Sequence, residues 1–216
     1  MAIKNNLRAF HNNPKIKEKY IARVKEHARL DQIAKGVYYE NINGKIRACG
    51  VGCTIEGSNH DAYETELGIP SQIAHLEDTI FENLPNELAM KFPLRFLEAV
   101  PVGADLSKVI AQFVIWQFED EKVGLKNIQE VIDDKEVYGF CEEVVALYKR
   151  ILNGEQPTED EFYDLYLKID VTWAWARAGA GARAGAWARA WAEAWAGAYE
   201  QMADKLIELL ENAPVE

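Results

Sequence analysis

The chain has 216 residues, of which 49% are hydrophobic, and a formal net charge of −11. This length is sufficient for a substantial core, built as one domain or as two tightly packed subdomains. The acidic balance disfavours general binding to nucleic acid, and no apolar run is long enough to span a membrane. The start "MAIKNNLRAF" is too polar for a signal peptide, so we expect a cytoplasmic protein whose three cysteines are free thiols.

Positive charge is concentrated at the start of the chain. Residues 1–50 contain eleven Lys or Arg and four Asp or Glu, a net +7 against −18 for the remainder. Asn13 and Pro14 predict the cap and the first residue of a helix that extends to about Ile33. Beside its apolar row, this helix carries a cationic row of Lys15, Lys19, Arg23 and His27. The cationic row is either a solvated face or the border of an anion pocket.

A β-hairpin near 37–55 is the expected sheet. Aromatic and β-branched residues alternate there around Asn43-Gly44, which is the strongest short hairpin signal. Ser58 and Asp61 then resemble a capping box, and Gly68 provides a stop, so we expect a helix over 59–67.

Helical periodicity predicts most of the remaining chain. The expected elements are a helix at 71–84, a short helix before Pro101, a central helix within 104–120 and an amphipathic helix at 135–152. The first of these has an apolar row of Ile73, Leu76, Ile80 and Leu84. Thr158 and Glu161 make a capping box for a following helix.

The segment 173–198 has alanine at every even position and Trp, Arg, Gly or one Glu at the odd positions. Alanine is the best helix former and is depleted in strands, so we predict a helix despite the period of two. The Trp residues then form one slowly winding row, because a spacing of four drifts by only about 40° per step. Such a row packs in the core, forms an interface or stacks on a planar ligand. A six-base repeat in the gene is an alternative origin of the pattern.

The segment "CGVGCTIEGSNH" allows several interpretations. We favour a glycine-kinked strand with buried thiols. A zinc site would use Cys49, Cys53, His60 and Glu64, although the spacing is not a standard one. A nucleophilic site would use Cys53, with His60 as base and Glu64 as its orienting group. The backbone N–H groups of Gly50 to Gly52 would alternatively bind a phosphate.

Several segments together carry a family resemblance: "FHNNPKIKEKYIARVKEH", "CGVGCT", "HDAYETELGIPSQIAHLEDTIFENLP", "FLEAVPVGADLS" and the Ala/Trp/Arg repeat. In this order they resemble an uncharacterised family encoded in bacterial and phage genomes, and they span most of the chain. The resemblance implies tolerance for repeat length and a phage or mobile-element setting, but no particular activity.

Together these features predict a mainly α protein, a helical bundle-like single domain over 1–216 with one small hairpin and a long C-terminal Ala/Trp-rich helix. Our leading functional hypothesis is a non-catalytic, homo-oligomeric protein that captures a small anionic, nucleotide-derived ligand. In a phage setting it would deny an immune signal to its receptor. The expected ligand-binding residues are Lys19, Arg23, His27, Arg47, Gly50, Gly52, His60, Arg177, Arg183, Trp187, Arg189 and Trp191. We expect no cofactor and no metal. A hydrolase or transferase based on Cys53, His60 and Glu64, and a protein–protein assembly module, are the alternatives.

Overall fold

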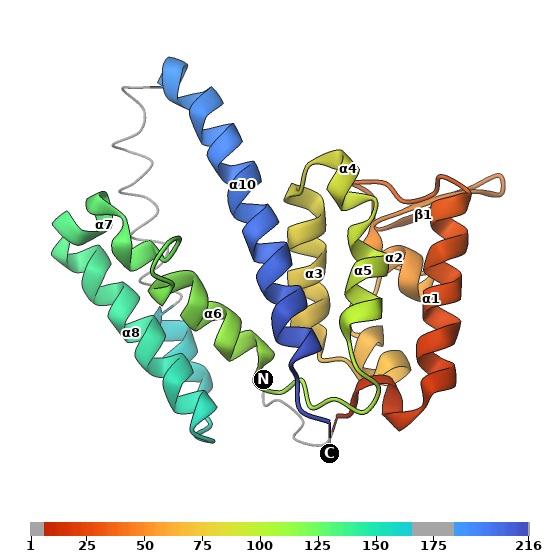
Figure 1. Ribbon diagram of the computed structural model, residues 1–216, viewed down its shortest axis with the longest axis horizontal. Helices are drawn as coiled ribbons and strands as arrows, with labels where there is room; N and C mark the ends of the chain where they lie inside the picture. The colour runs from red at the N-terminus through yellow and green to blue at the C-terminus, as the bar shows by residue number, and fades with distance from the viewer. Residues whose placement is uncertain (1–6, 166–183, 216) are drawn as a thin grey trace. The chain divides into compact units, whose positions relative to one another are not determined.

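The computed structural model describes residues 7–165 and 184–215, with the backbone alone described for Glu130 and for 184–196 (Figure 1). Its elements are helices and one two-stranded antiparallel sheet, which confirms the predicted mainly α class. Contacts divide the chain into two compact units, which are taken here in turn. The first comprises 3–109 and 196–216, and the second 110–195 together with the first two residues. A single domain over 1–216 stays a prediction.

The first unit begins with a capped helix. In α1 (Pro14–Arg29), the Asn13 side chain accepts a hydrogen bond from the backbone N–H of Lys15 at 3.1 Å, and Pro14 occupies the first helical position. The helix buries Tyr20, Val24 and His27 on one face. It ends four residues before the expected Ile33, because Asp31 adopts a positive φ of 54° and turns the chain.

The predicted hairpin is present, but it is shorter than expected. Strands β1 (Tyr39–Ile42) and β2 (Lys45–Ala48) pair in antiparallel register around Asn43 and Gly44. Both turn residues have positive φ, as a two-residue hairpin of this type requires. The segment Gly50–Ile55, expected to be extended, instead forms helix α2. A Cβ at Gly52 would overlap the carbonyl oxygen of Tyr38, so only glycine lets α2 pack this closely against the chain before β1.

Next come η2 (Tyr63–Leu67), a single π-helical turn, and helices α3 (Ser71–Asn83), α4 (Asn86–Ala89) and α5 (Phe92–Ala99). The helix expected over 59–67 therefore begins only at Tyr63, and His60 lies in the turn before it. Helix α2 packs against α1, α3 and α5 (Figure 1). The core between them contains Val24, Val51, Ile73, Ile80, Phe96 and Leu97.

Helix α10 (Ala184–Glu211) contributes its C-terminal part to the same unit. There it buries Ala203, Leu206, Ile207 and Leu210. Its Asp204 accepts a hydrogen bond from Arg95 of α5 at 2.8 Å. The predicted helix over 173–198 is confirmed from Ala184 onward, and residues 173–183 lie outside the described part of the chain.

The second unit contains α6 (Val109–Glu119), η3 (Leu125–Asn127), α7 (Gln129–Asp133) and α8 (Lys135–Leu152). The carboxylate of Asp134 caps α8 by accepting from the backbone N–H groups of Glu136 and Val137. The predicted capping box is confirmed, since Thr158 N–H donates to Glu161 at 2.7 Å and Glu161 N–H donates to Thr158 Oγ1 at 3.2 Å.

Candidate functional site

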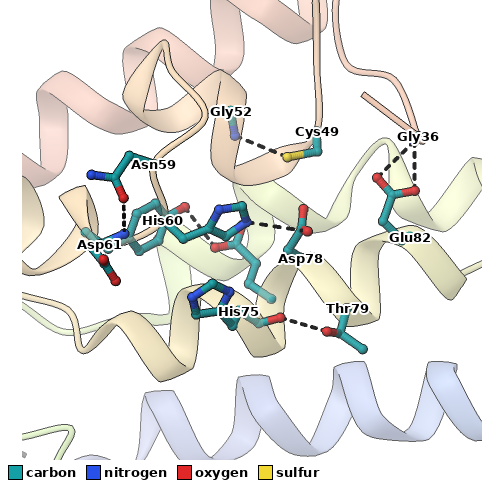
Figure 2. A network of polar contacts seen from close by, with 12 residues as sticks. Gly36, Cys49, Gly52, Asn59, His60, Asp61, His75, Asp78, Thr79 and Glu82 are labelled. Carbon is teal, nitrogen blue, oxygen red and sulfur yellow. Dashed lines mark hydrogen bonds and ion pairs between the residues drawn. The ribbon is translucent and has the colours of Figure 1, made fainter. Parts of the chain in front are cut away.

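Three side chains that can bind a metal converge in the first unit: Cys49, His60 and Asp78. Their ligand atoms all lie within 4.8 Å of one another, and among the described residues no other group of three or more His, Cys, Asp or Glu side chains does so. Figure 2 shows His60 facing Asp78, with Cys49 close by and directed toward Gly52. Cys49 lies between β2 and α2, His60 in the turn before η2, and Asp78 in the middle of α3. The packing of α2 on α3 therefore builds the site.

Cys49 is the cap of helix α2. Its Sγ accepts a hydrogen bond from the backbone N–H of Gly52 at 3.3 Å. Burial raises the pKa of the Cys49 thiol above its ordinary value, and the neighbouring Asp78 carboxylate raises it further. Without a cation beside it, Cys49 is therefore a protonated thiol at neutral pH.

His60 is 7% exposed, and its Nε2 lies 3.4 Å from Oδ2 of Asp78. This is an ion-pair distance, but the geometry is not that of a hydrogen bond, so Nε2 has no hydrogen-bond partner. The Asp78 carboxylate raises the pKa of His60, as does the carbonyl of Ser58. Because the pKa of His60 is raised, the imidazole must lose a proton from Nε2 before this nitrogen can bind a metal.

Two aromatic rings flank His60. The ring of Tyr38 meets it edge-on, with centroids 5.5 Å apart, and Tyr38 is 60% exposed. The ring of His75, an exposed residue of α3, stacks on His60 with centroids 4.7 Å apart and an interplanar angle of only 2°. We call Tyr38 and His75 the aromatic rim of the site, and both residues are exposed.

Asp78 contacts both other members of the trio. Burial opposes its ionisation, but His60 and Cys49 outweigh that effect, so the pKa of Asp78 lies below its ordinary value. Its side chain is 16% exposed, and its buried Oδ1 has no hydrogen-bond partner. The carboxylate is therefore ionised, and its Oδ1 is available to bind a cation.

A second buried acid, Glu77, precedes Asp78. The hydroxyl of Tyr63 donates to Glu77 Oε2 at 2.8 Å, whereas Oε1 has no partner. Burial raises the pKa of Glu77 well above its ordinary value. Oε1 lies beside Gly50, the residue after Cys49, where an added Cβ would stand 3.3 Å from it. Glu77 is therefore a neutral acid next to the trio.

The trio has the composition of a zinc site, and the separation of its His60 and Asp78 ligand atoms fits the edge of a zinc tetrahedron. Thiolate, imidazole and carboxylate are the protein ligands of Zn²⁺, and ligands about 2.0–2.1 Å from the metal in a tetrahedron stand ~3.3 Å apart. The separation of 3.4 Å between His60 Nε2 and Asp78 Oδ2 matches this edge. A catalytic relay would instead place the imidazole between thiol and carboxylate, whereas here Asp78 interacts with both.

His60 lies with Cys49 and Asp78, and not with the expected Cys53 and Glu64. Cys53 and Glu64 are not among the converging groups. The thiol of Cys53 is buried and donates to the carbonyl oxygen of Ala48 at 3.5 Å. Glu64 Oε1 accepts hydrogen bonds from the backbone N–H and the hydroxyl of Ser71. Cys49 was considered only as a zinc ligand, and sequence reasoning did not identify Asp78.

The basic residues expected at an anion pocket have partners within the chain. Arg23 donates to the Thr54 carbonyl oxygen at 2.7 Å and lies 3.4 Å from a carboxylate oxygen of Glu56. His27 bonds to Gln32 at 2.6 Å, and its Nε2 lies 3.6 Å from Glu56. Lys19 lies over the ring of Tyr20 at 4.7 Å.

The other expected ligand-binding residues are dispersed. Arg47 is exposed on β2, opposite Glu40. Gly50 and Gly52 belong to α2 and are close-packed, so they do not form an open phosphate loop. Arg177 and Arg183 lie outside the described residues. The backbone of Trp187, Arg189 and Trp191 belongs to α10, but their side chains also lie outside the description.

Among the described helices, none has the length and apolar character needed to cross a lipid bilayer. Comparison of the chain with protein-family models, with curated proteins and with solved structures found no match. Its function must therefore be inferred from the geometry of its own site.

Proposed function

We propose that the protein binds a divalent transition metal of the zinc class through Cys49, His60 and Asp78. The observation that carries this proposal is the convergence of three ligand atoms within 4.8 Å of one another. One sulfur, one nitrogen and one oxygen donor suit zinc better than magnesium or calcium, which prefer oxygen ligands alone. Sequence alone predicts no metal, whereas the fold brings Asp78 to Cys49 and His60 and so completes a set of three ligands.

Unsatisfied polar atoms at the site support the proposal. His60 Nε2 and Asp78 Oδ1 are buried without hydrogen-bond partners. An unpaired buried atom typically costs about 1–3 kcal/mol, and at His60 Nε2 the ion pair with Asp78 offsets part of that cost, so folded proteins rarely retain such atoms without an occupant or a role. A cation bonded to His60 Nε2 and to one carboxylate oxygen of Asp78 would offset most of this cost.

The thiol makes binding pH-dependent. Because the pKa of Cys49 is raised, the free protein holds a proton on Sγ at neutral pH. A thiol must lose its proton to ligate a metal, so binding releases a proton and the apparent affinity rises with pH. Protonation of His60 also opposes metal binding. Because the pKa of His60 is raised, loss of this proton adds to the rise of apparent affinity with pH.

Cobalt substitution tests the proposal directly. Co²⁺ bound by a thiolate gives a near-ultraviolet charge-transfer band, which should appear with one Co²⁺ per chain and be reversed by Zn²⁺. Cys49→Ser should abolish the band while keeping a good cap on α2. Cys53→Ala is the matched control, because it removes a buried thiol of the same helix that is not in the trio, and it should retain the band. Absence of metal binding, or a band that follows Cys53, rejects the proposal.

The expected Cys/His-dependent hydrolase or transferase finds less support. Cys53 and Glu64 do not converge with His60, and burial raises the pKa of Cys53 to about 12. A nucleophilic cysteine needs a lowered pKa, which neither Cys49 nor Cys53 has.

Capture of a small anionic, nucleotide-derived ligand by a cytoplasmic homo-oligomer remains a separate proposal, as does the phage setting. Its support is the sequence pattern of the Ala/Trp/Arg repeat. Native mass spectrometry with cyclic and ADP-ribose-type nucleotides tests it, since an intact ligand bound stoichiometrically would support it and no binding across the panel would reject it.

A further inference from the structure

We infer that the metal held by Cys49, His60 and Asp78 keeps one coordination position open for an exogenous oxygen ligand or a small monoanion. This inference rests on the proposed function. A structural zinc site is closed by four protein ligands, whereas a site with three protein ligands retains a position for water or substrate. Among the described residues, three ligand atoms converge and no fourth His, Cys, Asp or Glu side chain joins them.

His75 is the nearest candidate for a fourth ligand, and its orientation excludes that role in this conformation. The lone pair of an imidazole nitrogen lies in the plane of its ring. The rings of His60 and His75 are stacked 4.7 Å apart and deviate from parallel by only 2°. Lone pairs in two nearly parallel, separated planes do not meet at a common point a bond length away, so the two rings cannot share one metal.

The ligand atoms are buried, but exposed residues lie beside them. The Asp78 side chain is partly exposed, and both rings that flank His60 belong to exposed residues, Tyr38 and His75. Figure 2 shows His75 beside His60 at the site. We therefore expect a small ligand to enter past Tyr38 and His75 rather than through the core around Cys49.

Charge limits the class of ligand. A dication bound to one thiolate and one carboxylate leaves the centre with no net charge. Direct coordination of a dianion such as phosphate would bring the partly buried centre to −2, which is costly. The open position therefore takes water, an alcohol or a single small monoanion.

The experiment uses the full chain loaded with Co²⁺ at an alkaline pH where inorganic phosphate is almost entirely a dianion, with azide as the monoanion probe and phosphate as its comparison. We expect azide to change the visible d–d bands saturably while metal analysis after desalting shows Co²⁺ retained, and phosphate at the same ionic strength to have no effect. His75→Gln should bind Co²⁺ within about threefold of the parent and keep the azide response. Cys53→Ala should behave in the same way.

The outcomes separate the two proposals. If no Co²⁺ binds, the proposed metal site fails and this inference fails with it. If Co²⁺ binds but azide leaves the spectrum unchanged, the metal site stands and the open position is rejected. A loss of affinity of about tenfold or more in His75→Gln would also reject it, because that variant would then have lost a ligand.

Discussion

The sharpest test of the metal site is Asp78→Asn, which replaces a carboxylate by an amide of nearly the same shape. Asp78 is the ligand that the sequence did not predict. Its pKa is lowered by His60 and Cys49, the two residues that would bind the same metal. The matched control is Asp61→Asn. Asp61 is exposed, lies near His60 in Figure 2 and contributes to the raised pKa of His60, but it does not belong to the trio.

The magnitude follows from ligation. Removing even an outer partner of a metal ligand typically costs about 10–100-fold in affinity, so removing a ligand should cost at least about 100-fold. At free Zn²⁺ equal to about 100 times the dissociation constant, the parent gains about 2.7 kcal/mol, and the Asp78→Asn variant about 0.4 kcal/mol. For a chain of this size, each kcal/mol shifts Tm by about 2–4 °C, which gives about 5–11 °C for the parent and 1–2 °C for the variant.

Thermal unfolding with and without buffered Zn²⁺ measures these shifts. Asp61→Asn should keep nearly the whole Zn²⁺-dependent shift, because an exposed charge is screened and changes affinity by about threefold or less. If Asp78→Asn keeps the parental shift, Asp78 is not a ligand. If both variants lose the shift equally, local negative charge rather than ligation attracts the metal.

Three further predictions concern the supporting structure, each measured as a free energy of unfolding in urea. Gly52→Ala should destabilise the chain by about 1–3 kcal/mol or more, because its Cβ would overlap the Tyr38 carbonyl oxygen; Gly139→Ala, in open space on α8, should stabilise it by up to about 1 kcal/mol. Tyr63→Phe should cost about 1–3 kcal/mol by removing the donor to Glu77, whereas Tyr38→Phe on the exposed rim should change stability by less than about 0.5 kcal/mol. Because burial raises the pKa of Glu77, the folded state holds a proton that the unfolded state has lost, so stability falls as pH rises from about 4.3 toward the raised value. Glu77→Gln should remove that fall, and an equal pH dependence in parent and variant would contradict an acid buried at this position.

The parts of the fold that could be predicted depend on local signals. The cap at Asn13, the Asn43-Gly44 turn and the Thr158–Glu161 capping box each act within a few residues, and all three are present. The strand expected at Gly50–Ile55 was wrong, because the alternating pattern of this segment resembles a strand although the segment is helical. What makes it helical is the Cys49 cap together with the close approach of Gly52 to Tyr38. That approach joins residues brought together by the hairpin, which a short window of sequence does not show.

Only part of the site could be predicted from local sequence. His60 and Cys49 were identified by residue type within a single segment, but Asp78 reaches them only because α3 packs on α2. One signal was available in the sequence. Glu77 lies on the predicted apolar row of its helix, four residues after Ile73 and three before Ile80. An acidic residue on a buried row needs a partner or a role, and it would have drawn attention to its neighbour Asp78.

The distribution of unpaired polar atoms supports a site built for an occupant rather than for stability. Elsewhere in the described part of the chain, buried polar side chains are satisfied: His27 bonds to Gln32, Thr54 to the Gly50 carbonyl oxygen and Ser71 to Glu64. The described buried side-chain atoms without a partner are His60 Nε2, Glu77 Oε1 and Asp78 Oδ1. Imperfect packing would scatter such atoms through the core, because each costs a similar amount wherever it lies. Here they are confined to Asp78, its sequence neighbour Glu77 and the imidazole that faces Asp78. This clustering is expected of a binding site, because a bound ligand would supply the missing bonds.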